Sequence, residues 1–152
     1  MIKIQQSKTA DSRTCDVSKV SKEQLLLSSK QHTDDVMKGM LFFANMLIET
    51  AIKHDHDKFS GIDQFYADFR TKFESTKWWD NHLKVNRHHL LEKDGIREDV
   101  NLIDVLDMIV DCVMAGLGRA GSVYPLDINP DVLMKAFNNT VKILKSQVVV
   151  ED

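Results

Sequence analysis

Cysteine is scarce in this 152-residue chain, which has only Cys15 and Cys112. Cys15 lies in a polar N-terminal stretch and Cys112 in an apolar segment, so the sequence disfavours a disulfide framework and favours a reducing compartment. No apolar run approaches the roughly 20 residues of a membrane-spanning helix, and the N-terminus lacks the apolar core of a signal peptide. We therefore expect a soluble cytoplasmic protein with no membrane partner.

The chain also lacks a large excess of charge of either sign. Its formal net charge is −3 and its pI is about 6.0, which argues against a nucleic acid as the main partner. The sequence contains no P-loop, no dinucleotide-binding glycine motif and no serine nucleophile elbow. Phosphoryl transfer from ATP, hydride transfer and α/β-hydrolase chemistry are therefore disfavoured.

The length suits one domain with its own core. Residues 5–18 are rich in polar side chains without an apolar period, and we interpret 1–18 as a flexible leader before a single helical domain over 19–152. Apolar residues recur at helical spacing over about 32–53, and a shorter helix is expected over 21–29.

Further helices are expected along the rest of the chain. One begins at a capping box formed by Ser60 and Asp63, and another begins at Ser75 and continues past His89. A strongly apolar helix covers about 100–117, and a last one begins at Pro130 and runs to about Lys145. Only residues 148–150 show a pattern that favours a β-strand over a helix. The fold class predicted is all-α, an irregular bundle of five to six helices.

Histidine and aspartate gather in two short segments. His54-Asp55-His56-Asp57-Lys58 stands at the expected end of the long helix, and His82, His88 and His89 follow on a later one. His82 and His89 are two helical turns apart and share a face. Imidazole and carboxylate together suit Mn, Fe, Zn or Mg, so these residues are candidate ligands for one or two divalent ions.

Three aspartates stand on the most apolar helix. Asp104, Asp107 and Asp111 share one face, because their spacings are three, four and seven residues. A buried carboxylate must be paired, protonated or bound to a metal. We therefore expect a metal or catalytic role for at least one of them, the alternative being a solvated stripe.

His32 is a candidate ligand that requires a particular backbone. It precedes His54 by 22 residues, or about 33 Å along a straight helix. The two can share an ion only if the helix is broken, and Gly39 is the candidate break.

A histidine, a His-Asp pair some two dozen residues later and a distant aspartate together resemble the HD-domain superfamily of metal-dependent phosphohydrolases. The glycine that often precedes the lysine of that motif is Asp57 here. Over about 32–120 the chain also resembles a family of small phage and bacterial HD-like proteins. That resemblance is carried by Lys58-Phe59-Ser60, Tyr66, Phe69, Trp79, His82, Asn86, His88-His89, Leu106-Asp107-Met108-Ile109 and Asp111.

The resemblance implies one or two divalent ions. The first would be held by His32, His54, Asp55 and a late aspartate, given as Asp111, although the spacing also allows Asp104 or Asp107. The second would be held with help from His82 and His88 or His89. Asp55 would bridge the ions and orient the nucleophile. Lys58, Arg87 and Arg119 are candidate ligands for substrate phosphate.

The activity implied is hydrolysis of a nucleotide or other small phosphate ester in a bacterial or phage-infected cytoplasm. The Gly-Tyr-Pro segment of the cyclic-dinucleotide branch is absent, which disfavours that substrate. Trp78, Trp79 and Tyr66 could stack on a base, although tryptophan in a small helical protein is more often part of the core. Two alternatives stay open: a di-iron oxygenase of the same superfamily, and a non-catalytic phage-type binding protein with a structural metal.

Overall fold

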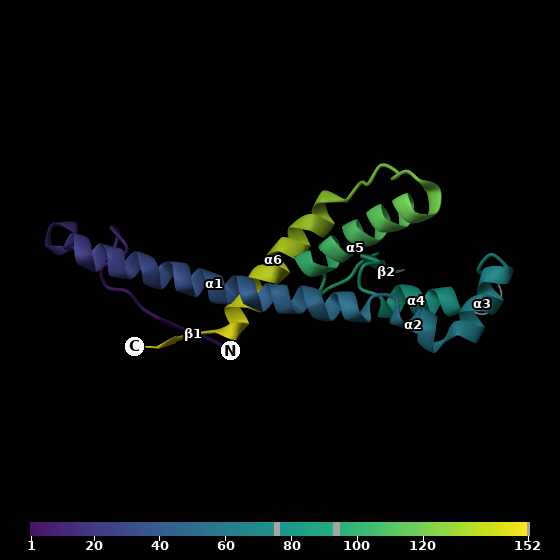
Figure 1. The fold of residues 1–152 in the computed structure, drawn as a ribbon, viewed down its shortest axis with the longest axis horizontal. Coiled ribbons are helices and arrows are strands. Elements are labelled where there is room, and N and C mark those ends of the chain that lie inside the picture. Colours follow the sequence, from purple (N-terminus) through teal and green to yellow (C-terminus); the bar gives the residue numbers. More distant parts are fainter. Residues whose placement is uncertain (75–76, 93–94, 152) are drawn as a thin grey trace. The chain divides into compact units, whose positions relative to one another are not determined.

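The computed structural model describes residues 1–74, 77–92 and 95–151. It divides into two compact units, Met1–Asn45 with Lys142–Asp152, and Met46–Val141. The single helical domain expected over 19–152 stays a prediction. Helices dominate both (Figure 1), so the predicted all-α class is confirmed.

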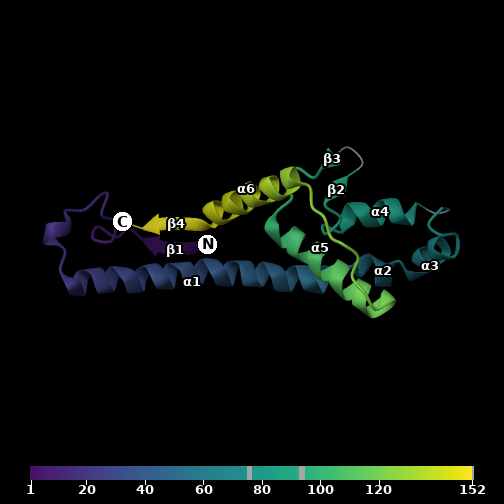
Figure 2. The same cartoon turned by 90° about the horizontal axis from the view of Figure 1, so that it is seen from above.

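The first unit contains a two-stranded parallel sheet beside a helix. Strand β1 (Ile2–Gln5) pairs with β4 (Val148–Glu151), with Ile2 opposite Val148, and Figure 2 shows the two strands side by side. Part of the expected flexible leader is thus a strand. The valines at 148–150 favour β4 because β-branched side chains suit extended backbone.

Helix α1 (Lys22–Lys53) is continuous. Ser21 and Gln24 form a capping box, in which the Gln24 backbone N–H donates to Ser21 Oγ (3.2 Å) and the Ser21 N–H donates to Gln24 Oε1 (2.8 Å). The two helices expected over 21–29 and 32–53 are therefore one, since no proline or capping glycine interrupts them. Gly39 does not break the helix.

The second unit contains shorter helices. These are α2 (His56–Ser60), α3 (Ile62–Arg70), α4 (Trp78–Val85), α5 (Leu102–Ala115) and the first part of α6 (Pro130–Gln147), with a hairpin of β2 (Leu91–Glu92) and β3 (Gly95–Ile96). A buried cluster of Leu90, Val100, Val105, Val132 and Ala136 joins α5 to α6. This core lies directly beside the segment that carries His88 and His89.

Several predicted helix ends are corrected. The N-cap of α3 is Gly61, without a side-chain cap, so the capping box at Ser60 does not form. Ser75 lies outside the described residues. Helix α4 ends at Val85 and not beyond His89, because Asn86 has an extended backbone and its side chain donates to the His82 carbonyl (3.1 Å), which competes with helix continuation.

The remaining helix ends agree more closely with the sequence. Asn101 and Asp104 form a capping box at the start of α5, and Pro130 begins α6 as expected, with Asn129 capping it. A π-helical turn, Gly116–Ala120, follows α5. Within the described ranges no helix is long and apolar enough to cross a membrane.

Candidate metal centre

The candidate site begins where α1 ends. Asp55 adopts a left-handed backbone conformation, with φ of 53°, which aspartate tolerates better than most residues. Its backbone N–H donates to Asn86 Oδ1 (3.1 Å), and this bond fixes the turn to the segment after α4. His54 Nε2 lies 3.5 Å from Asp55 Oδ2. The turn thus places adjacent imidazole and carboxylate groups at one point.

The two carboxylate oxygens of Asp55 face different histidines. Oδ2 faces His54 and also accepts a hydrogen bond from the Lys58 ammonium. Oδ1 lies 3.5 Å from His82 Nε2 and 3.7 Å from His88 Nε2. Asp55 therefore stands between His54 on one side and His82 and His88 on the other.

Two further aspartates orient the histidine rings. Asp107 Oδ1 lies 2.8 Å from His54 Nδ1, and Asp57 Oδ2 lies 2.9 Å from His82 Nδ1. Assigning the ring proton to Nδ1 in each case satisfies both carboxylates. The Nε2 lone pairs of both rings are then directed toward Asp55, as a carboxylate behind a metal-ligating histidine normally directs them.

Three buried polar atoms of the site lack a hydrogen-bond partner among the described residues: Asp55 Oδ1, His82 Nε2 and His89 Nε2. Burying such atoms unpaired is costly. Asp55 Oδ1 and His82 Nε2, 3.5 Å apart, are both acceptors in this tautomer. Ligand bonds of about 2.0–2.2 Å place neighbouring ligands roughly 3.0–3.5 Å apart, so a cation between them would satisfy both.

Potential ligand atoms within 4.8 Å of one another form three groups: His82, His88 and His89; His54, Asp55 and His88; and Asp55, Asp57 and His82. Asp111 adds a carboxylate oxygen 3.5 Å from His54 Nε2. This buried His/Asp cluster could hold a metal ion.

Protonation favours the ligand forms. Burial and the neighbouring histidines lower the pKa of His89 to about 4, and burial with the nearby His54 also lowers the pKa of His88. Both rings are therefore neutral near pH 7. Burial alone would raise the pKa of Asp55, but its hydrogen bond to Lys58 and the positive charge of Lys58 lower it below its usual value, so Asp55 is ionised.

The structure brings together most of the residues singled out in the sequence. His54, Asp55, His82, His88, His89 and Asp111 meet, and Lys58 contacts Asp55. Asp107 supports His54 from behind and is not itself in one of the three groups. His82 and His89 meet although they are not on one helix face, because the turn after Asn86 brings His88 and His89 back toward α4.

Arg87 lies outside this arrangement. Its guanidinium donates to both carboxylate oxygens of the buried Asp104 (2.7 and 2.8 Å) and to Asp99 (2.8 Å). These carboxylates raise the pKa of Arg87. The arginine proposed to bind phosphate is thus part of a structural ion pair at the start of α5, and Asp104 is its partner.

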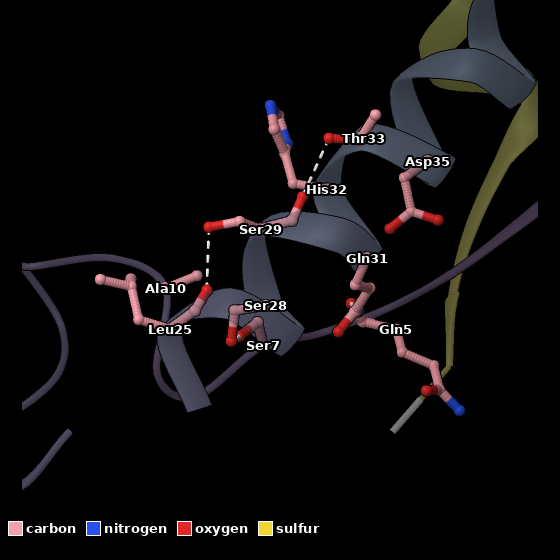
Figure 3. Close-up of a pocket in the computed structure, with 10 residues that line it drawn as sticks. All are labelled: Gln5, Ser7, Ala10, Leu25, Ser28, Ser29, Gln31, His32, Thr33 and Asp35. Carbon is pink, nitrogen blue, oxygen red and sulfur yellow. Dashed lines mark hydrogen bonds between the residues drawn. The ribbon is translucent and has the colours of Figure 1, made fainter. Parts of the chain in front are cut away.

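His32 also lies outside the His/Asp cluster. It belongs to the first unit, where it lines a pocket with residues such as Gln5, Ser28 and Thr33. Figure 3 shows its ring on the same side of α1 as Ser29 and Thr33. The unbroken helix removes the condition on which ligation together with His54 depended.

Sequence reasoning missed two supporting residues. Asp57 accepts from His82 Nδ1 and from the Asn86 amide (2.8 Å), while Asn86 also holds the Asp55 backbone. The signal was present, because Asp57 stands two residues after Asp55 and Asn86 stands four residues after His82. A carboxylate at that position indicates a support for a neighbouring histidine.

The His/Asp cluster opens into a cavity of about 510 Å³. His82, His88, His89 and Asp111 line one part of it, Lys58 and Arg119 provide positive charge, and four aromatic side chains, Phe65, Phe69, Phe73 and Trp79, complete the lining. Comparison of the chain with models of protein families, with curated proteins and with solved structures finds no match.

Proposed function

We propose that this protein is a metal-dependent hydrolase of small phosphate esters, nucleotides among them. The observation that carries the proposal is the environment of Asp55, whose two carboxylate oxygens each face a histidine nitrogen at 3.5 Å. Buried acceptors so arranged suit a pair of cations bridged by one carboxylate.

Each ion would have its own ligands around the shared Asp55. His54 and Asp111 would hold the first, and His82 and His89 the second, while His88 is near both groups. Mixed nitrogen and oxygen ligands suit Mn, Fe or Zn, with Mg favoured less because it prefers oxygen. Bound divalent ions would lower the pKa of a coordinated water and neutralise phosphoryl oxygens.

The side chains of this chain supply orientation and charge. Asp107 and Asp57 hold the His54 and His82 rings in place. Lys58 and Arg119 border the cavity and can donate to phosphate oxygens. In the reaction a water oxygen bonds to phosphorus, the ester P–O bond breaks, and the departing alcohol takes a proton, so the products are inorganic phosphate and the alcohol.

The test is phosphate release by protein purified without a histidine tag. After its metals have been identified, the protein is assayed with Mn, Fe, Zn or Mg against a panel of phosphate monoesters. We expect hydrolysis that chelation abolishes, and that is lost in Asp55→Asn but kept in Glu49→Ala, a change at an exposed position on α1. Metal-bound protein that releases no phosphate from any ester contradicts the proposal, and oxygen consumption with bound iron supports the oxygenase instead.

A further inference from the structure

The aromatic side of the cavity identifies the organic part of the substrate. The four side chains there, which we call the aromatic wall, are Phe65 and Phe69 from α3, Phe73 from the turn after it, and Trp79 from α4. Their rings form a connected surface: the centroids of Phe73 and Trp79 are 5.1 Å apart, and those of Phe69 and Phe73 are 6.2 Å apart. The wall continues to the candidate ligands, because Trp79 also stacks with His82 at 5.1 Å.

Two rings of the aromatic wall are open to solvent, and the other two, Phe65 and Trp79, are partly buried. Phe69 is 62% exposed and Phe73 is 37% exposed, whereas the neighbouring Trp78 is 4% exposed and its ring centroid lies 4.6 Å from that of Phe65. Grouped aromatic rings that stay exposed at the edge of a polar cavity are typical of a binding surface rather than of a core.

The backbone around Phe73 is strained in a way that maintains the wall. Lys72 and Phe73 have φ angles of 56° and 67°, a left-handed region that is unfavourable for a bulky side chain. The Phe73 N–H donates to the Asp68 carbonyl (2.7 Å), which holds this turn in place. This strained turn keeps the Phe73 ring among the residues that line the cavity.

The positive charges in the cavity limit where a phosphate group can bind. Among the described residues that line the cavity, the positively charged side chains are Lys58 and Arg119. A phosphate monoester carries nearly two negative charges near pH 7, which the two cationic side chains and bound divalent ions would offset. The cavity volume of about 510 Å³ is in the range that holds a small molecule.

Resting on the function proposed above, we infer that the substrate is a phosphate monoester whose organic group carries a flat aromatic or heteroaromatic ring. The ring lies against the aromatic wall, and the phosphate points toward Lys58, Arg119 and the His/Asp cluster. The wall is therefore the specificity-determining surface, since every flat ring can stack on it while an aliphatic group cannot.

The experiment compares two esters with the same sugar phosphate. Adenosine monophosphate and ribose 5-phosphate differ by the base, and both are measured for phosphate release and, by calorimetry, for binding to the Mn-loaded full chain. Phe69→Leu removes an exposed ring of the wall. Phe59→Leu is the matched control, because Phe59 is 78% exposed on α2 and does not line the cavity.

We expect adenosine monophosphate to be bound at least about tenfold more tightly than ribose 5-phosphate, since base stacking contributes about 1–3 kcal/mol. Phe69→Leu should reduce this advantage about fivefold or more, whereas Phe59→Leu should preserve it. If both esters are hydrolysed and bound equally well, the inference on the ring is wrong and the hydrolase proposal stands.

Failure of the hydrolase proposal gives a different result from failure of the inference on the ring. Tighter binding of adenosine monophosphate that depends on Phe69, without phosphate release, supports the aromatic wall and contradicts the hydrolase proposal. If neither ester is bound or hydrolysed, both are overturned. An equal loss for both esters in Phe69→Leu also overturns the role of the wall, because a ring-binding surface acts only on the ester that has a ring.

Discussion

Asp57→Ala tests whether the carboxylate behind His82 positions that ring for metal binding. His82 is fully buried and Asn86 is 6% exposed, and both lose the Asp57 carboxylate as a hydrogen-bond acceptor. Each buried donor left without a partner costs about 1–3 kcal/mol. We expect the free energy of unfolding of the metal-free protein to fall by about 2–4 kcal/mol.

Asp57→Ala should also weaken metal binding. Without Asp57 the His82 ring can rotate or change tautomer, and loss of such a support typically lowers metal affinity about 10–100-fold. Metal affinity is measured by calorimetry and unfolding by urea titration, with Glu49→Ala as the control. Asp57→Asn should restore part of the stability, because its amide oxygen can still accept from one donor. If Asp57→Ala binds metal as tightly as the unaltered protein, Asp57 does not position His82.

Three further predictions concern the surroundings of the site. Lys58→Ala should raise KM for phosphate esters without loss of bound metal, because it removes a cation next to Asp55; kinetics together with elemental analysis check this, and metal loss would contradict it. Arg87→Met should lower the free energy of unfolding by about 3–5 kcal/mol, since it leaves the Asp104 carboxylate buried and unpaired; equal thermal melting would show that this ion pair is unimportant. With a chelator present, the free energy of unfolding should fall as the pH drops from about 6.5 to 4, because the lowered pKa of His89 lets the unfolded chain take up a proton before the folded one. His89→Asn should flatten this pH dependence. An unchanged dependence in that variant would contradict the role of His89.

The local candidates could be found in the sequence because they are close in the chain or share a helix face. The His54-Asp55 pair and Asp111 are examples, and they lie at the His/Asp cluster as their residue types suggested. The three-residue and four-residue spacings of the α5 aspartates predicted that they share one face. These spacings did not identify the partner of each aspartate. Asp104 pairs with Arg87, Asp107 with His54, and Asp111 faces His54 Nε2, because each partner comes from a distant segment.

Other features depended on helix ends, which the sequence defines poorly. His88 and His89 were expected on a helix and lie in the turn after it, because the Asn86 side chain competes with the helical hydrogen bonds. The candidacy of His32 depended on a break in α1 that does not exist. The aromatic wall was also missed as a unit, because Phe73 enters it through a left-handed turn that no periodic pattern predicts.

The arrangement of the site supports the proposal that Asp55 bridges metal ions held by the surrounding histidines. It is tested most directly by the metal content of the purified protein and of Asp55→Asn, which keeps the size of the side chain and a residue type that tolerates the left-handed backbone. We predict one or two divalent ions per chain and a melting temperature that chelation lowers, since ions that bind only the native state stabilise it. Asp55→Asn should lose both the metal and the response to chelation. Full metal content in Asp55→Asn, or unaltered protein that binds no divalent ion, would contradict the bridging role of Asp55.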